Sequence, residues 1–172
     1  MVEGGSTLKG MLMDLEVVQK GEFVLTSGRK SDYFVDIKRA STNPRVLKEI
    51  AKEIAPHVGT RKIAGMALGA VPIAVAVSLE TGMPYVIVRK EAKGHGTKGL
   101  VEGEIEQGEE FVIVEDVATT GGSTLKVAEA LEQKGAVVTK AIVVVDREEG
   151  AVELLSNNGM ELISIFKAKD LT

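Results

Sequence analysis

The sequence predicts an α/β fold in which a central, mostly parallel sheet is flanked by helices. Two observations predict it: several apolar runs have the length of a strand, and helical patterns separate most of them. The apolar runs are Ile63 to Leu68, Tyr85 to Val88, Phe111 to Val114 and Val137 to Val145. The helical stretches are Val71 to Glu80 and Ser123 to Lys134. Because apolar residues dominate the predicted strands, we expect both faces of the sheet to be covered.

The residues before the first apolar run predict a helix, an extended region and a second helix. From Thr7 to Lys20, apolar side chains recur every three or four positions, which is typical of an amphipathic helix. Residues 23–37 are predicted to be extended around a Ser-Gly turn. Asn43 followed by Pro44 is a typical helix start, and the apolar pattern continues this helix to about His57.

The rest of the chain predicts one edge strand and one long loop. Glu161 to Phe166 is expected to add a strand at the edge of the sheet. Residues 89–110 form a connection that is rich in Gly, Lys and Glu and longer than most connections in compact domains. Its composition fits a disordered spacer and an active-site lid equally well. Since no repeat or linker interrupts the chain, we expect a single domain over residues 1–172.

The composition favours a globular protein that acts on small molecules. The chain is 44% hydrophobic and 27% charged, with a net charge of -4 and no long basic block, which argues against a nucleic-acid-binding protein. The absence of cysteine excludes disulfides, thiolate metal sites and a cysteine nucleophile, and fits a reducing compartment. There is no secretory pattern at the start, and no run reaches the ~20 apolar residues of a membrane span. We therefore expect a cytoplasmic protein that contacts neither nucleic acid nor membrane.

The most informative residues follow the apolar run that ends at Val114. Two acids, Glu115 and Asp116, come first, and the sequence Thr-Thr-Gly-Gly-Ser occupies residues 119–123. In an open parallel sheet, ligands bind beyond the carboxyl ends of the strands, where the next helix offers unpaired N–H groups to an anion. Adjacent glycines let the backbone close around a phosphate. The acids would repel that phosphate unless they face sugar hydroxyls or a cation, so the segment predicts a site for a ribose 5-phosphate with free hydroxyls.

An apolar run, two acids, two variable residues and Thr-Thr-Gly resemble the signature of the type I phosphoribosyltransferases. The resemblance implies the fold of that family, with a small N-terminal hood and a flexible catalytic loop. It also implies that the signature binds phosphoribosyl pyrophosphate (PRPP), with the acids on the ribose diol and the loop around the 5-phosphate. The alternative is an ordinary capped connection between a strand and a helix, with its acids in solvent.

Two further segments resemble the orotate phosphoribosyltransferases in particular. YVIVRKEAKGHGTKGLVEG, residues 85–103, is similar to their catalytic loop, and FVLTSGRKSDYFVDIKRA, residues 23–40, is similar to their N-terminal segment. The resemblance implies that orotate and PRPP give orotidine 5'-monophosphate and diphosphate, with Mg²⁺ carried on the diphosphate and no metal bound by the protein alone. It further implies a homodimer with shared active sites. A glycine pattern at residues 94–99 also matches a dinucleotide-binding motif, but no helical pattern follows it.

Carried over by position, the resemblance assigns the site residues. Lys93, His95 and Asp116 are the implied catalytic residues. The implied PRPP-binding residues are Arg89, Lys90, Lys93, His95, Glu115, Asp116, Val117, Ala118, Thr119, Thr120, Gly121, Gly122 and Ser123. Preorganised cations on a closing loop suit a leaving diphosphate, because it gathers negative charge in the transition state. The alternative for these lysines is a solvated, cationic loop.

For the base, the resemblance implies Thr119 and Arg147 as orotate-binding residues. A guanidinium fork is the natural partner of the orotate carboxylate. The alternative is that Arg147 pairs with Glu148 or Glu149 at the surface. Phe34 is expected to pack against the base or within the core.

The chain departs from its bacterial relatives at two places. Thr26 stands where they have a lysine, and Leu68-Gly69 stands where they have Tyr-Lys. The loop at residues 65–72 would therefore hold pyrophosphate through its backbone, because small residues let amide groups approach the ligand. Two other functions stay open: transfer to a purine base, and PRPP sensing by a regulator.

Overall fold

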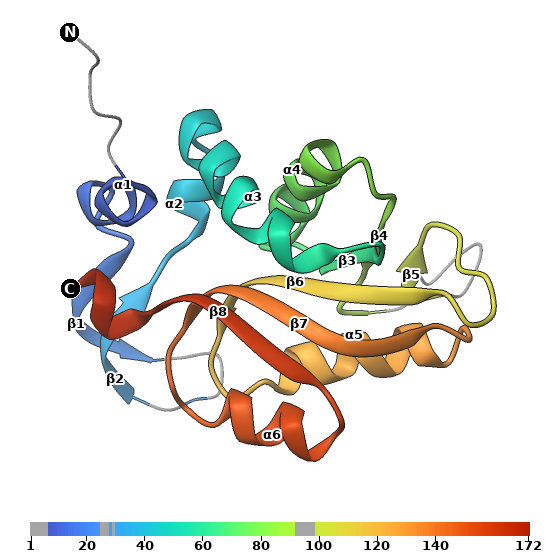
Figure 1. The fold of residues 1–172 in the computed structure, drawn as a ribbon. Coiled ribbons are helices and arrows are strands. Elements are labelled where there is room, and N and C mark those ends of the chain that lie inside the picture. The colour runs from blue at the N-terminus through green and yellow to red at the C-terminus, as the bar shows by residue number, and fades with distance from the viewer. Residues whose placement is uncertain (1–6, 25–27, 29, 92–98) are drawn as a thin grey trace, which may run out of the picture.

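The fold is built on a six-stranded sheet (Figure 1). The computed structural model describes residues 7–24, 28, 30–91 and 99–172. In chain order the strands of this sheet are β3 (Lys62–Met66), β4 (Tyr85–Val88), β5 (Val101–Glu102), β6 (Glu110–Ala118), β7 (Val137–Asp146) and β8 (Glu161–Lys167). Their spatial order is β5-β4-β3-β6-β7-β8, and only the β4–β5 pair is antiparallel. The predicted parallel sheet and the predicted edge strand at its end, β8, are confirmed.

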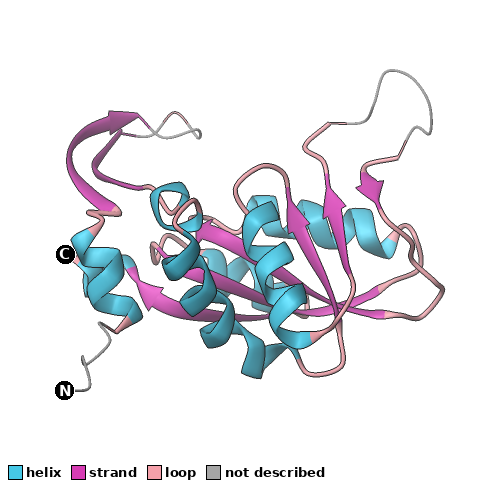
Figure 2. Cartoon of the chain, turned by 90° about the horizontal axis from the view of Figure 1, so that it is seen from above, coloured by secondary structure: helices cyan, strands magenta, loops and turns pink. Residues whose placement is uncertain are grey.

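Helices cover both faces of the sheet (Figures 1 and 2). On one face lie α3 (Pro44–Val58) and α4 (Val71–Thr81), and on the other lie α5 (Gly122–Glu132) and α6 (Ala151–Asn157). Side chains of β6 alternate between the two faces: Val112 and Val114 join the core under α3 and α4, whereas Phe111 and Ile113 join the core under α5. Within the described ranges, no helix combines the length and apolar character needed to cross a membrane.

The N-terminal region differs from the prediction. Helix α1 (Leu8–Asp14) is short, and Val18 to Lys20, which were predicted to be helical, begin strand β1 (Val18–Val24). The predicted helix is wrong after Asp14 because Glu16 takes a φ of 49°, which a continuing helix does not allow, and Val18 pairs with Val35.

Strands β1 and β2 (Lys30–Val35) pair antiparallel in a separate two-stranded sheet, here called the hood hairpin. A short helix, α2 (Lys38–Ser41), connects it to α3. The predicted start of α3 is confirmed, since the Asn43 side chain accepts hydrogen bonds from the N–H groups of Arg45 and Val46. The chain ends in a 3-10 turn, Ala168–Leu171.

Strand β6 is longer than predicted. Its apolar run ends at Val114, but pairing with β7 continues to Ala118, which lies opposite Asp146. Glu115 and Asp116 therefore lie within the last part of the strand instead of following it. Strand β3 is shorter than predicted and ends at Met66, whereas β5 and α6 were not predicted.

Candidate active site

The two acids of β6 differ in their environments. Glu115 is buried, with 5% of its surface exposed, and Asp116 is half-buried. The Oε2 atom of Glu115 is buried and accepts no hydrogen bond from any described residue. Burial, followed by the charge of Asp116, raises the pKa of the Glu115 carboxyl well above its ordinary value, while Lys90 acts in the opposite direction. An unpaired buried carboxyl oxygen is costly in the folded protein, so a ligand hydroxyl that reaches it would gain a ready partner.

The loop between β3 and α4 packs directly against Asp116. A Cβ atom built on Gly69 would lie 2.8 Å from the Cγ atom of Asp116 and closer still to its Oδ2 atom. The Oδ1 atom of the same carboxylate accepts a hydrogen bond from the N–H of Val117 at 2.9 Å. The peptide bond between Ala67 and Leu68 in this loop is cis. The structure thus places the predicted pyrophosphate loop in contact with Asp116, the second acid of the pair.

The Thr-Thr-Gly-Gly-Ser segment turns the chain from β6 into α5. Gly121 has a φ of 84°, in the left-handed region that glycine adopts readily, and α5 begins at the next residue. No side chain caps this helix, so its first N–H groups remain available to an anion. Thr120 and Ser123 are exposed and Thr119 is half-buried. An anion could bind to these groups, and the phosphate site itself stays a prediction.

Arg147 follows β7 and is held from three sides. Only 3% of its side chain is exposed. Its Nε donates to Glu149 at 2.7 Å, its Nη2 donates to the Ser31 hydroxyl at 2.9 Å, and its Cζ lies 4.2 Å from the centroid of the Tyr33 ring. The alternative of a surface pair is therefore correct about Glu149 but wrong about the surface, because the hood hairpin covers the arginine.

A backbone hydrogen bond of Arg147 brings together the two residues that were predicted to bind orotate. Its N–H donates to the carbonyl oxygen of Ala118 at 2.9 Å, which brings Arg147 next to Thr119 across the β6–β7 ladder. Sequence reasoning missed the contacts of Ser31 and Tyr33 with this arginine. Both residues belong to the N-terminal motif, but nothing in a linear motif indicates that its side chains reach a residue 116 positions away.

Phe34 lies in the hood hairpin, and its described ring contact is with Phe23. The two ring centroids are 5.6 Å apart, and the planes are tilted by 33°. Phe34 is half-buried. Phe34 therefore packs within the hood hairpin and does not belong to the buried core of the described residues, and packing against the base stays a prediction.

Two of the predicted diphosphate-binding residues are described. Arg89 donates from Nε to Glu102 of β5 at 2.8 Å, and both side chains are about 40% exposed. Its N–H donates to the carbonyl oxygen of Leu100 at 2.7 Å, so the two ends of the predicted catalytic loop meet at the β4–β5 edge. Lys90 is exposed and close enough to Glu115 to influence its charge. Lys93, His95 and Thr26 lie outside the described residues.

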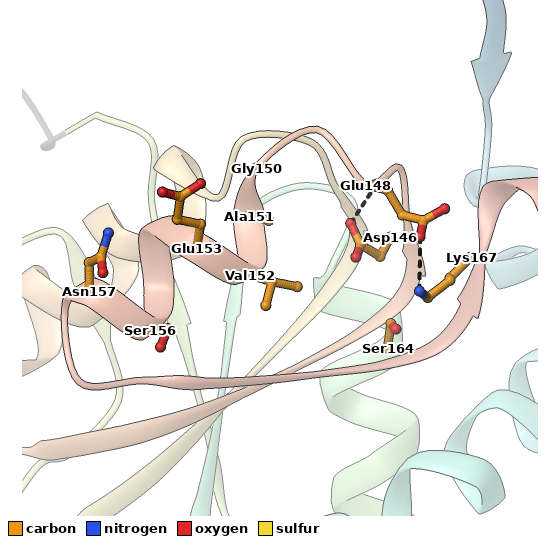
Figure 3. Close-up of a pocket in the computed structure, with 10 residues that line it drawn as sticks. All are labelled: Asp146, Glu148, Gly150, Ala151, Val152, Glu153, Ser156, Asn157, Ser164 and Lys167. Carbon is orange, nitrogen blue, oxygen red and sulfur yellow. Dashed lines mark hydrogen bonds and ion pairs between the residues drawn. The ribbon is translucent and has the colours of Figure 1, made fainter.

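A cavity of about 480 Å³ lies beside the end of β7, between α6 and β8 (Figure 3). At one end, the Glu148 side chain pairs with Lys167 at 2.8 Å and its N–H donates to Asp146 at 2.8 Å. None of the predicted PRPP-binding residues lines this cavity. It is therefore separate from the site formed by β6, the turn before α5 and Arg147.

Comparison with known proteins identifies the family. Residues 37–165 match the phosphoribosyl transferase domain. An orotate phosphoribosyltransferase from Methanothermobacter thermautotrophicus is 52% identical over 161 residues, which cover 93% of this chain and 89% of the relative. Another from Thermoplasma volcanium is 53% identical over 154 residues and covers 90% and 92% of the two chains.

A solved structure agrees with these relatives. The crystal structure of orotate phosphoribosyltransferase from Aeropyrum pernix superimposes with a TM-score of 0.83 at 37% identity, and the match covers 95% of each chain. The fold and the family that the motifs predicted are thereby confirmed. The chain belongs to the phosphoribosyltransferase family and, within it, to the orotate phosphoribosyltransferases.

Proposed function

We infer that this chain is an orotate phosphoribosyltransferase, a pentosyltransferase that moves the 5-phosphoribosyl group of PRPP to orotate. The products are orotidine 5'-monophosphate and diphosphate, in pyrimidine nucleotide synthesis. The observation that carries this function is the pairing of Ala118 with Asp146 at the ends of β6 and β7. This pairing brings a phosphate turn and an acid pair on one strand beside a buried arginine on the next. One ligand can therefore span a sugar-phosphate site and a carboxylate site.

The ribose of PRPP would bind at the acid pair. Glu115 offers a buried oxygen that lacks a partner, and Asp116 offers a half-buried carboxylate. The 5-phosphate would accept hydrogen bonds from the first N–H groups of α5 and from the hydroxyls of Thr119, Thr120 and Ser123. As the bond between the anomeric carbon and the diphosphate breaks, positive charge develops on the ribose. The carboxylate of Asp116 stabilises that charge, which gives this residue its catalytic role.

The base would bind between Thr119 and Arg147. The guanidinium of Arg147 pairs with the orotate carboxylate, and a ring nitrogen of orotate forms the new bond to the anomeric carbon. The reaction needs no covalent enzyme intermediate, because the diphosphate leaves as the base nitrogen approaches from the opposite face. Arg147 thus selects the base by its carboxylate.

The diphosphate would be held by cations of the loop after β4. Arg89 and Lys90 lie at the described start of that loop, and we assign Lys93 and His95 to it from the sequence. A lysine charge stabilises the leaving diphosphate most when the bond is broken, and His95 is able to supply a proton near neutral pH. The backbone around Gly69 borders the same region and has no side chain to obstruct the ligand.

Magnesium fits this site as a metal that arrives on PRPP. Within the described part of the chain, no three His, Asp or Glu side chains gather closely enough to hold a metal ion. The carboxyl oxygens of Glu115 and Asp116 would supply donors of the kind that Mg²⁺ prefers, together with oxygens of PRPP and water. When bound, the metal would neutralise charge on the diphosphate.

We also propose a homodimer, on the basis of the motif resemblance, in which the catalytic loop serves the partner's site. The cytoplasmic location expected from the sequence stays a prediction.

The function is tested by mixing the purified protein with PRPP, Mg²⁺ and orotate and following the loss of orotate absorbance in the ultraviolet. We expect orotate to be consumed and orotidine 5'-monophosphate to form. Consumption of adenine or hypoxanthine in place of orotate would support transfer to a purine base. PRPP binding without turnover of any base would support a sensor.

A further inference from the structure

The hood hairpin holds the arginine that meets the base. We propose that Ser31 and Tyr33 are positioning residues, which fix the orientation of Arg147 and thereby set the affinity for the carboxylate of the pyrimidine base. This inference rests on the proposed function of Arg147. It adds a second element, more than a hundred residues away in sequence, to the determinants of base selection.

The hydroxyl of Ser31 is oriented to accept from the arginine. Its O–H donates to the carbonyl oxygen of Tyr33 at 2.7 Å, which uses the single hydrogen of the hydroxyl. The lone pairs that remain accept from the N–H of Tyr33 at 3.3 Å and from Nη2 of Arg147 at 2.9 Å. Because the donor direction of the hydroxyl is already occupied, Ser31 presents an acceptor to Arg147 and holds it in one direction.

The ring of Tyr33 packs against the same guanidinium. The distance of 4.2 Å from Cζ to the ring centroid is that of a cation over an aromatic face. Stacking on a ring leaves the edge of a guanidinium free for hydrogen bonds, and this edge carries all five of its N–H donors. Tyr33 therefore limits rotation of the fork without occupying the donors that a carboxylate needs.

The hydrogen bonds of Arg147 to described residues leave the Nη1 end of its guanidinium for a ligand. Nε is occupied by Glu149 and Nη2 by Ser31. Among the described residues, Nη1 donates to no other group. An arginine side chain loses considerable rotamer freedom when it binds, and a fork that is already held loses less. The variants that release the fork should therefore weaken orotate binding more than they slow the chemical step.

Steady-state kinetics with purified variants test this proposal. Ser31→Ala removes the acceptor, and Tyr33→Leu removes the ring. We expect each to raise the KM for orotate roughly 10-fold, the scale of one lost hydrogen bond to a charged group or one cation–π contact, with the KM for PRPP unchanged. Ser31→Thr and Tyr33→Phe keep the hydroxyl and the ring and should restore most of the affinity. Asp32→Ala, an exposed position between the two on the same strand, is the matched control.

A double-mutant cycle tests whether Ser31 acts through the orientation of Arg147 or only by holding the hood hairpin against the rest of the protein. In an Arg147→Lys background, Ser31→Ala should have almost no further effect on the KM for orotate, because its partner fork is already gone. Equal rises in the KM for orotate and PRPP, or full additivity in that background, would overturn the proposal. If the unmodified protein does not consume orotate, the proposed function itself fails. If it does, and Arg147→Lys raises the KM for orotate while Ser31→Ala and Tyr33→Leu do not, only the positioning role fails.

Discussion

Asp116 occupies the space that a side chain at position 69 would need. A Cβ atom on Gly69 would come within 2.8 Å of its Cγ atom, a separation that real Cβ contacts do not show. The loop between β3 and α4, proposed to hold pyrophosphate, and Asp116, proposed to bind the ribose, are therefore packed as one unit. This contact explains why a glycine suits position 69 in this chain.

Gly69→Ala should displace the Asp116 carboxylate and lower kcat/KM for PRPP by about 10-fold or more, the scale of a misplaced catalytic group. The loop lies at the surface end of the sheet, so the free energy of unfolding should change by only ~1 kcal/mol. Steady-state kinetics and urea unfolding measure the two effects. Gly10→Ala is a control, because a Cβ there meets only the Thr7 hydroxyl at 3.6 Å. Full activity in Gly69→Ala would mean that Asp116 does not need its present position.

Glu115 should make the stability of the protein depend on pH. Its folded-state pKa is raised by burial and by Asp116, so the carboxyl favours the folded state below its ordinary pKa, and this contribution is lost as pH rises through the raised pKa. Glu115→Gln should remove this loss of stability at higher pH, because a glutamine side chain does not ionise. Its melting temperature should match that of the unmodified protein near pH 4, roughly the ordinary pKa of Glu, and exceed it increasingly at higher pH.

The control for this comparison is Glu132→Gln, which removes one exposed carboxyl from α5. It changes the net charge by the same amount but leaves the buried carboxyl of Glu115 in place. A difference between Glu115→Gln and the unmodified protein that stays constant across pH would show that burial does not raise the pKa of Glu115. Despite its greater stability, Glu115→Gln should bind PRPP less tightly, since it loses a ribose acceptor.

The sequence predicted the central sheet more accurately than the N-terminal region, where α1 and β1 lie. Strands β6 and β7 each contain an unbroken run of buried apolar residues, Phe111 to Val114 and Ala141 to Val145, so their pattern is strong. In the segment after Asp14, the spacing of apolar residues fits a helix, but pairing of Val18 with Val35 makes a strand. Val35 lies outside the stretch of sequence whose spacing predicts the helix, so that stretch alone does not reveal the pairing.

The sequence predicted the part of the candidate site whose residues are adjacent in the chain. It did not predict the contacts between residues from separate segments. Glu115, Asp116 and the glycine turn are neighbours in sequence, so their shared function is visible in one motif. The contacts of Arg147 with Ser31 and of Asp116 with Gly69 arise only when separate segments meet at the ends of the strands. These contacts depend on tertiary packing, which no spacing of residue types encodes.

Arg89 should contribute to PRPP binding but little to stability. Its ion pair with Glu102 is about 40% exposed on both sides, and such pairs contribute less than ~1 kcal/mol. Arg89→Met should therefore raise the KM for PRPP while leaving the urea midpoint almost unchanged. Lys52→Met, which removes an exposed pair with Glu49 on α3, is the matched control and should alter neither. A large loss of stability in Arg89→Met alone would assign the arginine a structural role.

Lys93 should act mainly in the transition state. Because the leaving diphosphate gains charge as its bond to ribose breaks, Lys93→Ala should lower kcat by about 100-fold or more and raise the dissociation constant for PRPP much less. Single-turnover kinetics and direct titration with PRPP measure these two quantities. Equal losses in both would indicate that Lys93 binds the ground state and the transition state alike.

Gly121 and Gly150 offer a matched pair for testing the phosphate turn. Each immediately precedes a helix in a left-handed conformation, with φ of 84° and 107°. A Cβ on Gly121 would lie 3.1 Å from the Cα atom of Ala151, whereas a Cβ on Gly150 would meet nothing within 4 Å. Alanine at either position costs ~1 kcal/mol in backbone strain, and at Gly121 it also forces α5 away from α6.

Gly121→Ala should therefore unfold at a lower urea concentration than Gly150→Ala and should also raise the KM for PRPP, since the start of α5 carries the N–H groups that we propose bind the phosphate. Gly150→Ala should lose stability alone. If the two variants bind PRPP equally well, the turn before α5 does not hold the phosphate, and the 5-phosphate must bind elsewhere at the ends of the strands.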